Sequence, residues 1–585
     1  DKEKQWLEVI SILQESIPQL LVYGKYEPTK KQGPAIWLKC MVAKMLPEAN
    51  WDGDAVPIIY MPGVAKSDLR NVETAVFNFQ PLLEYQYTGT IFLQDNGLEL
   101  DIITFLEDSD NGLGIKVSKD DSTKAALKKV LPKIFQDSEV FANKTIIDAN
   151  YLNSRIFHNL EQSILKWMCK GDSYLQAIEE NKRDLFVDLC KSQYEFEPDY
   201  KNILAIAEKL GSQKNSWKLI WQMYAAAPKR YSELEELLRK AKPKDLGEGM
   251  FALPEESWPQ INEQKEEALA KELTKAGKQD RGEAIKSLAN LEKENSARRD
   301  WVWYELGEAP LTDALQYLNQ MAIYASETYS SSTIEEIKNY YITSGYKIDQ
   351  NMRKALAAVK TDKDKKCVKA IIKLIYQPWL ESLTNKFQKL TEADATVFTS
   401  QTAVPEAEDF VLFVDALRYE LAEELKEILL KQKINVTLQA GWSAIPSVTA
   451  TAKPNVSPVA TEISLNSKIE EFNPEFENGS KVSTEKFREE LGKKNYTYVG
   501  KADESQGEGK YWQEIGDIDK KGHSEQADVV RRLDDFFEQV KEIIDVCFEK
   551  GIKRIKIVTD HGWLLLPGGL PKTKLNAGLA ETRWG

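Results

Sequence analysis

The stretch DFVLFVDALRYE (residues 409–420) decides the fold of the C-terminal part of this chain. Its apolar run 410–414 is typical of a buried strand, and the spacing over residues 419–430 predicts an amphipathic helix after it. The stretch IKRIKIVTDHGW (residues 552–563) repeats the arrangement, with a strand expected over residues 555–558. Parallel strands that alternate with helices in this way form open α/β sheets.

Acidic residues follow both predicted strands. Asp415 comes directly after the first strand, and Asp560 and His561 come just after the second. Ligands of open parallel α/β sheets bind outside the carboxyl ends of the strands, so we expect these side chains at one rim of the sheet. Each motif taken alone is also typical of a turn residue or a helix N-cap.

A segment bounded by prolines, IPSVTATAKP (residues 445–454), supplies hydroxyl groups between the two strands. Its hydroxyls belong to Ser447, Thr449 and Thr451. Hydroxyls in such a segment are most often turn residues, but coordination to a metal ion can turn one of them into a nucleophile.

A fourth motif, DIDKKGH (residues 517–523), places Asp519 four residues before His523. Alone it is typical of a solvated loop. The chain contains only three histidines, and two of them lie in these motifs. The third, His158, falls in a helical pattern and is expected to be structural. Carboxylate, imidazole and hydroxyl ligands suit zinc, manganese or magnesium, so the four motifs together predict a site for a pair of divalent ions.

The order Asp, P-x-x-T, D-x-x-G-H and D-H-G resembles the alkaline phosphatase superfamily, in its nucleotide pyrophosphatase and phosphoglycerate mutase branch. More closely, VDALRYE, IPSVTATAKP and VTDHGW resemble the PglZ domain of BREX (bacteriophage exclusion) defence systems. The detailed match covers residues 409–585. The resemblance implies an alkaline-phosphatase-like α/β domain, bound divalent ions with zinc as the expected metal, and other BREX proteins as partners.

The resemblance also implies roles for individual residues. One metal ion would be held by Asp415, Thr449, Asp560 and His561, with Thr449 as the nucleophile. The second would be held by Asp519 and His523. The superfamily uses one more His after D-H-G. None follows His561 here, and we expect that ligand beyond Gly585, with the domain incomplete at the end of this chain.

Two basic residues near the predicted rim are candidates for substrate binding. Arg418 could contact a phosphate oxygen through its guanidinium group, and Lys453 could act as a point charge. A surface salt bridge or a solvated cation is the alternative for both. The C-x-P-x-R turn that sulfatases require does not occur.

We predict three domains from the changes of pattern along the chain. Residues 1–150 are expected to be α/β, with a strand over residues 56–63 and a hairpin turning at Asn96 and Gly97. Residues 151–400 show helical periodicity, and residues 401–585 form the sheet domain. The polar segment 466–510 is expected to be an insertion over the site.

The composition narrows the class of protein. The net charge of −14 argues against a surface coated for nonspecific DNA binding, although nucleic acid and a second copy of the chain stay open as partners. Five cysteines without a C-x-x-C pair are expected to be buried thiols in a reducing cytoplasm. No signal peptide and no apolar run of 18 residues occurs, so a membrane partner is not expected and the chain is predicted to be cytoplasmic.

The sequence therefore predicts a metal-dependent phosphodiesterase or phosphatase of a BREX system. Two alternatives stay open. One is a non-catalytic scaffold with a vestigial metal site, and the other is a metal-dependent phosphomutase.

Overall fold

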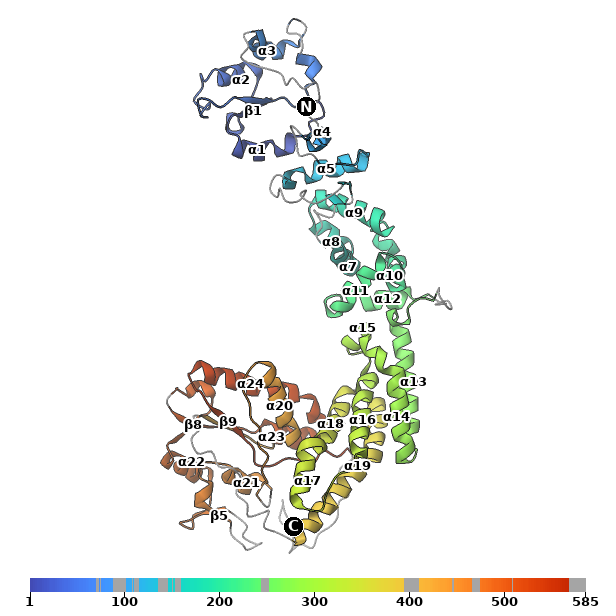
Figure 1. The fold of residues 1–585 in the computed structure, drawn as a ribbon, viewed down its shortest axis with the longest axis vertical. Helices are drawn as coiled ribbons and strands as arrows, with labels where there is room; N and C mark the ends of the chain where they lie inside the picture. The colour runs from blue at the N-terminus through green and yellow to red at the C-terminus, as the bar shows by residue number, and fades with distance from the viewer. Residues whose placement is uncertain are drawn as a thin grey trace. The chain divides into compact units, whose positions relative to one another are not determined.

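The computed structural model of the chain describes residues 1–69, 73, 75–87, 102–107, 109, 115–134, 146–149, 151–152, 159–243, 252–393, 410–444, 447–465, 474–507 and 509–567. The chain divides into two compact units, Asp1–Leu253 and Pro254–Gly585. The boundary falls inside the segment that the sequence assigns to one helical domain, residues 151–400. The described part combines small sheets with many helices, which confirms the mixed α/β and helical layout (Figure 1).

The first unit begins with a three-stranded parallel sheet in the order β2-β1-β3. β1 (Leu20–Tyr23) pairs with β2 (Gln32–Gly33) and β3 (Ile58–Tyr60). Leu21 of β1 packs in one apolar core with Trp37 of α2 (Ala35–Val42). The α/β character predicted for this region is therefore confirmed, and the expected hairpin at residues 96–97 lies outside the described residues.

The other described elements of the first unit are mostly helices; helical periodicity predicts only those after residue 150. Its helices are α1 (Ile10–Ser16), α3 (Gln80–Tyr87), α4 (Ile102–Glu107), α5 (Asp121–Ile134), α7 (Leu160–Lys170), α8 (Asp172–Ala177), α9 (Glu180–Tyr194), α10 (Ile203–Ser212), α11 (Trp217–Ala226) and α12 (Leu234–Ala241). His158 lies outside the described residues.

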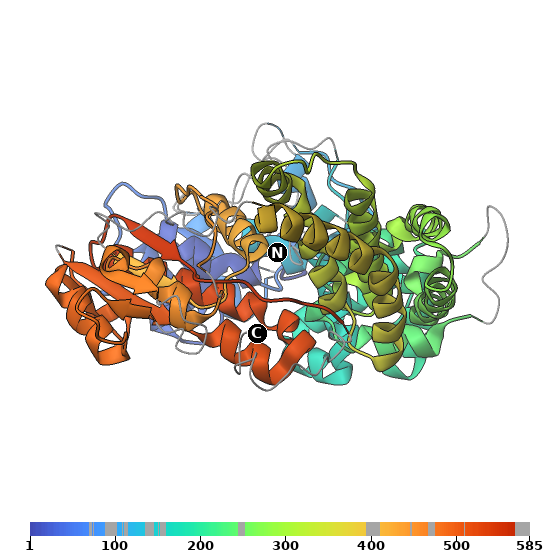
Figure 2. The same cartoon turned by 90° about the horizontal axis from the view of Figure 1, so that it is seen from below.

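The second unit begins with a helical bundle. Its helices are α13 (Pro259–Ala276), α14 (Arg281–Asn295), α15 (Val302–Glu305), α16 (Pro310–Ser326), α17 (Ile334–Tyr340), α18 (Tyr346–Ala358) and α19 (Asp362–Ala393). Local signals explain several starts: a proline opens α13 and α16, Asp280 caps α14, and a capping box precedes α17. Figure 2 shows the bundle helices side by side, and α13, α14, α16, α17, α18 and α19 share one apolar core.

A four-stranded parallel sheet follows the bundle, in the order β7-β8-β4-β9. β4 (Phe410–Val414) is an inner strand and is buried along its whole length, as its apolar run predicts. Its neighbours are β8 (Lys510–Ile515) and β9 (Ile555–Val558), and β7 (Tyr496–Tyr498) lies at the edge.

Helices cover both faces of this sheet (Figure 1). Residues 410, 412 and 414 of β4 pack with α20 (Tyr419–Lys431) and α24 (Leu533–Glu549). Val411 and Phe413 point to the other face, where they share a core with Phe487 of α22 (Thr484–Lys493). The alternation of side chains along a strand thus gives a three-layered α/β/α arrangement.

Part of the sheet differs from the sequence-based expectation. β8 was not predicted, and residues 466–510 do not form only an insertion because they supply β6 (Pro474–Phe476), α22 and the edge strand β7. β6 pairs in antiparallel fashion with β5 (Ile463–Leu465). A 3₁₀ turn, Gln526–Arg531, precedes α24.

The bundle and the sheet form one unit because they share a core. Val529, Val530 and Leu565, from the C-terminal part of the chain, are buried in the same apolar cluster as α16, α18 and α19. In the part of the chain that the structure describes, no helix combines the length and apolar character needed to cross a membrane.

Candidate metal centre

Two neighbouring strands bring the predicted acidic residues to one edge of the sheet. β4 ends at Val414 and β9 ends at Val558, and the two strands pair in parallel with Phe413 opposite Val558. Asp415 therefore leaves the sheet at the same edge as Asp560.

A third strand contributes to this edge from the other side of β4. Ile515, the last residue of β8, lies opposite Val414, and its carbonyl accepts a 2.9 Å hydrogen bond from the N–H of Asp415. The chain then enters α23 (Asp517–Glu525), which carries Asp519. The charge of Asp519 is one of the causes that raise the pKa of Asp415.

Asp415, Asp560 and His561 offer ligand atoms that all lie within 4.8 Å of one another. His561 Nε2 is 3.6 Å from Asp415 Oδ1 and 3.7 Å from Asp560 Oδ2. We call these three residues the acidic triad. A carboxylate, carboxylate and imidazole set is typical of zinc and related divalent ions.

The buried oxygen of Asp560 tests whether the triad fits a metal ion. Asp560 is 2% exposed, and its Oδ2 has no hydrogen-bond partner. A buried polar atom without a partner is costly, and a cation bound between the triad residues would remove that cost. The site therefore fits a divalent ion.

The hydrogen bond on the far side of the imidazole ring orients His561. Its Nδ1 lies 2.9 Å from the carbonyl oxygen of Gly562. A carbonyl oxygen can only accept, so Nδ1 carries the proton and Nε2 presents its lone pair to the triad. Metal-ligating histidines are commonly fixed in this way.

Thr449 is the hydroxyl that the structure brings to the triad. It is the first residue of α21 (Thr449–Asn455), a short helix where the sequence suggested a turn. Its Oγ1 is 3.1 Å from His561 Nε2 and 3.4 Å from Asp415 Oδ1. Ser447, by contrast, is exposed, and the hydroxyl of Thr451 donates to the carbonyl oxygen of Val448.

The turn after β4 is tied to the segment after β9. Ala416 has a left-handed backbone (φ 62°), and its N–H donates to Asp560 Oδ1 at 3.3 Å. The N–H of Leu417 donates to Thr559 Oγ1 at 2.9 Å. Ser443 donates from its hydroxyl to the carbonyl oxygen of Asp560 at 2.6 Å. The sequence analysis did not identify Ser443 or Thr559, although Thr559 stands inside the VTDHGW motif.

The triad carboxyl groups have perturbed acidities. Burial, followed by the charges of Asp560 and Asp519, raises the pKa of Asp415 to about 6. Burial also raises the pKa of Asp560. Like charges gathered in a place of low dielectric are expected to behave in this way, and a cation would lower both pKa values again.

The second predicted metal site is described in part. Asp519 and His523 were expected on a loop, but both belong to α23. The side chain of His523 lies outside the described residues, so its pairing with Asp519 stays a prediction.

The two predicted phosphate-binding cations are held in ion pairs. Arg418 is 6% exposed, and its Nη2 lies 3.1 Å from Asp349 Oδ1 in α18, so the alternative of a surface salt bridge or a solvated cation is wrong for this residue. Lys453 Nζ lies 2.7 Å from Glu514 Oε1. Contact of either side chain with a substrate stays a prediction, and it would require these pairs to be shared or broken.

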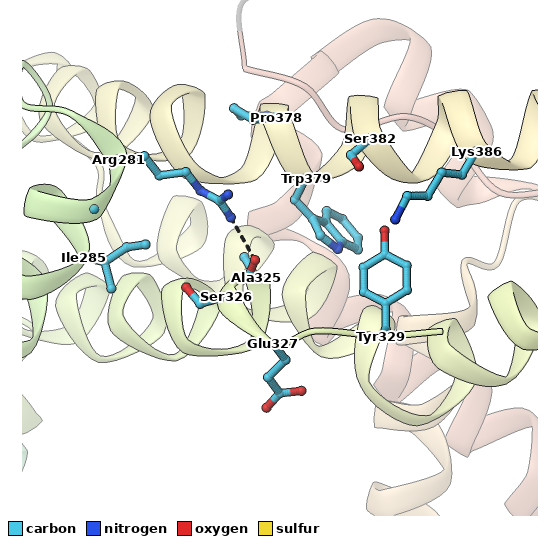
Figure 3. A pocket seen from close by; sticks show the side chains of 11 residues that line it. Arg281, Ile285, Ala325, Ser326, Glu327, Tyr329, Pro378, Trp379, Ser382 and Lys386 are labelled. Atoms are coloured by element: carbon cyan, nitrogen blue, oxygen red, sulfur yellow. Dashed lines mark hydrogen bonds between the residues drawn. The ribbon is translucent and has the colours of Figure 1, made fainter. Parts of the chain in front are cut away.

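A cavity of about 450 Å³ lies elsewhere in the helical bundle, between α14, α16 and α19 (Figure 3). Its lining includes Arg281, whose guanidinium donates to the carbonyl oxygen of Ala325, and Lys386, whose ammonium lies over the ring of Tyr329. Glu327 is the one carboxylate among its lining residues, which include no His or Cys. The cavity therefore lacks a ligand set like that of the acidic triad, and we place the candidate site at the sheet edge.

Comparisons with known proteins do not assign the chain: no family model, no curated protein and no solved structure matches it.

Proposed function

We propose that the chain is a divalent-metal-dependent hydrolase of phosphoric esters, a phosphodiesterase or phosphatase with an alkaline-phosphatase-like sheet domain. One observation carries the proposal. Segments 34 and 112 residues apart bring the Thr449 hydroxyl within hydrogen-bonding distance of Asp415 and His561, beside a buried carboxylate oxygen of Asp560 that has no hydrogen-bond partner. The parallel sheet with helices on both faces is compatible with this fold.

Each residue has a chemical role in this proposal. Asp415, Asp560 and His561 would hold one ion, for which zinc is the first candidate and manganese or magnesium the alternatives. The bound ion supplies Lewis acidity and lowers the pKa of an oxygen ligand. Thr449 would give its proton to solvent and attack phosphorus through Oγ; the ester P–O bond breaks, and the leaving oxygen takes up a proton from solvent and departs as the alcohol. Water would then cleave the bond between Thr449 Oγ and phosphorus, which releases phosphate from a monoester substrate or the remaining phosphomonoester from a diester substrate. Asp519 and His523 are the proposed ligands of a second ion.

Metal removal tests the reaction class. The chelator-treated protein is expected to lose hydrolysis of an aryl phosphodiester and an aryl phosphomonoester, and added zinc or manganese is expected to restore it. An unchanged rate after complete metal removal would contradict the proposal.

Thr449→Ala tests the nucleophile. The rate of the metal-loaded protein is expected to fall by at least about 100-fold, because the attacking oxygen is lost. Ser447→Ala is the matched control, since it removes an exposed hydroxyl two residues earlier and should leave the rate near that of the unmodified protein. Equal rates for the two variants would assign the nucleophile elsewhere.

The resemblance to the PglZ domain supports a role in phage defence together with other BREX proteins. Asp560→Asn separates an enzyme from a scaffold in a phage plating assay. An enzyme should lose protection while its complex with BREX partners still assembles, whereas a scaffold should keep both.

A phosphoglycerate substrate separates hydrolysis from transfer of phosphate within one substrate molecule. A hydrolase releases inorganic phosphate from it, whereas a phosphomutase would release none.

A further inference from the structure

A buried polar network joins the helical bundle to the turn that carries Asp415. At its centre is Asp349 of α18, which is 4% exposed. Its Oδ1 accepts a 2.6 Å hydrogen bond from Tyr376 and lies 3.1 Å from Arg418 Nη2, while its Oδ2 accepts a 2.5 Å hydrogen bond from Tyr341. Tyr341 opens a π-helical turn, Tyr341–Gly345, and such turns occur frequently at functional sites.

Arg418 touches both segments that supply the acidic triad. It follows Asp415 by three residues, and its guanidinium carbon lies 5.0 Å from the centre of the Trp563 ring, two residues after His561. A Cβ atom added at Gly562 would lie 3.6 Å from Arg418 Cγ, so the Arg418 side chain passes beside Gly562. The side chain therefore spans the turn after β4 and the segment after β9.

The turn held by Arg418 is strained. Ala416 lies between Asp415 and Arg418 and has φ 62°, a conformation that a residue with a Cβ atom adopts at a cost. Such a conformation persists only when the surrounding structure determines it. The hydrogen bonds from Ala416 to Asp560 and from Leu417 to Thr559 hold it on one side, and the buried ion pair of Arg418 holds it on the other.

The network is not simply a stabilising ion pair. Arg418 Nη1 is buried without a hydrogen-bond partner, and its contact with Glu420 is long, at 3.8 Å. Buried ion pairs are weak evidence for stability, and an unsatisfied buried donor is a cost. The unsatisfied donor of Arg418 lowers stability, and it lies beside the strained turn at Ala416. We therefore infer that function constrains the conformation of this turn.

We propose that Arg418 and Asp349 are positioning residues that clamp the turn 415–418 against Trp563 and so hold Asp415 and His561 at the spacing needed to bind a divalent ion. The inference rests on the proposed function, because it concerns the same ion. It assigns to the helical bundle a direct part in shaping the site. It also gives Arg418 a role through the turn instead of through contact with substrate.

Zinc affinity measured by competition with a chromophoric chelator tests the clamp without an activity assay. Asp349→Asn keeps the shape of the side chain and removes the charge that holds Arg418, and the affinity is expected to fall by about 10-fold or more, as changes behind metal ligands commonly cause. The matched control is Glu424→Gln. It weakens the ion pairs of Glu424 with Arg353 and Lys354 on α18 and leaves the ion pair between Asp349 and Arg418 intact. Its zinc affinity is expected to stay near that of the unmodified protein.

A second substitution separates positioning from loss of stability. Ala416→Gly removes the cost of the left-handed turn, so Asp349→Asn combined with Ala416→Gly should recover part of the lost zinc affinity. Because Gly removes the same cost from a folded state with an intact ion pair, Ala416→Gly alone is the reference: positioning predicts that Gly raises the zinc affinity more in the Asp349→Asn background than in the unmodified background, while it raises the melting temperature by a similar amount in both. Tyr376→Phe, which removes one hydrogen bond to Asp349, serves if Asp349→Asn does not fold, with a smaller loss of affinity expected.

The outcomes are distinguishable. Failure of the unmodified protein to bind zinc, manganese or magnesium overturns the proposed function together with the clamp. Zinc binding by the unmodified protein with equal affinity in a folded Asp349→Asn variant overturns the clamp alone. Equal loss of affinity in Asp349→Asn and Glu424→Gln, without recovery by Ala416→Gly, also overturns it, because that pattern follows stability.

Discussion

At the scale of single residues, the acidic triad concentrates negative charge where the fold excludes water. Asp415 has a pKa raised to about 6 by burial and by the charges of Asp560 and Asp519. A carboxyl group with a raised pKa stabilises the folded state below its unfolded pKa, and this contribution is lost as pH rises through about 6. Without a cation, the triad therefore costs stability near neutral pH.

Asp415→Asn tests this cost. In the metal-free protein the free energy of unfolding at pH 7.5 is expected to rise by roughly 1 to 3 kcal/mol, because a buried charge is removed. The difference should vanish below about pH 3, where Asp415 is neutral in both states. Urea unfolding at the two pH values measures it. A variant that is less stable than the unmodified protein at pH 7.5 without metal would contradict this account.

Metal affinity should depend on pH for the same reason. Only the ionised carboxyl groups bind a cation, so zinc affinity is expected to fall as pH is lowered through about 6, where Asp415 takes up its proton. Competition with a chelator at pH 7.5 and pH 5.5 checks this, with the pH dependence of the chelator measured separately. An affinity that is independent of pH over this range would place the ion elsewhere.

Much of the candidate site could be predicted from the sequence. Asp415, Asp560 and His561 follow strands whose apolar runs are plain in the sequence, and Thr449 was chosen by its place in a motif. The ion pair of Arg418 could not be predicted, because its partner Asp349 lies 69 residues earlier in a helical segment with no signal of contact. The turn at Ala416 could not be predicted either, since no glycine marks the left-handed conformation.

At the scale of secondary structure, β4 was predictable and β8 was not. β4 is a continuous apolar run, whereas β8 has the sequence KYWQEI, in which a lysine, a glutamine and a glutamate interrupt the pattern. Gln513 is nevertheless buried, and its neighbour Trp512 is fully buried. The polar residues of β8 are tolerated because Trp512 supplies the apolar contact, in a stacked arrangement with Phe413 of β4.

Trp512→Ala is expected to lower the free energy of unfolding of the second unit by about 3 to 5 kcal/mol, because it leaves a cavity between the sheet and α22. Denaturant unfolding followed by circular dichroism measures the change. Thr497→Ala in the edge strand β7 is the control, since its side chain is exposed and the effect should stay within about 0.5 kcal/mol. Equal effects would show that β8 is not an inner strand.

At the scale of the whole molecule, the chain divides at residues 253 and 254 and not where the sequence pattern changes. Periodicity reveals that residues 151–400 are helical, but it does not reveal which helices share a core. The second half of that segment packs with residues far along the chain: Arg531, for example, donates to the carbonyl oxygen of Val359. Such contacts depend on tertiary structure, which cannot be predicted from the local periodicity of apolar residues.

Residues 254–585 expressed alone are therefore expected to unfold in one cooperative transition and to bind zinc with the affinity of the full chain. Their bundle core, both sheet cores and the acidic triad lie within this unit. Thermal unfolding and chelator competition on the fragment and the full chain make the comparison. If the folded fragment does not bind zinc, residues of the first unit contribute to the binding site.

The path of the chain beyond the site limits how this protein can be engineered. After His561 the chain places Trp563 against both the sheet core and the bundle core, and Leu565 is buried in the bundle. An excised sheet beginning at residue 410 would expose these apolar side chains to water and leave Arg418 without Asp349. A transplant of the sheet into another scaffold would therefore have to include α18 and α19.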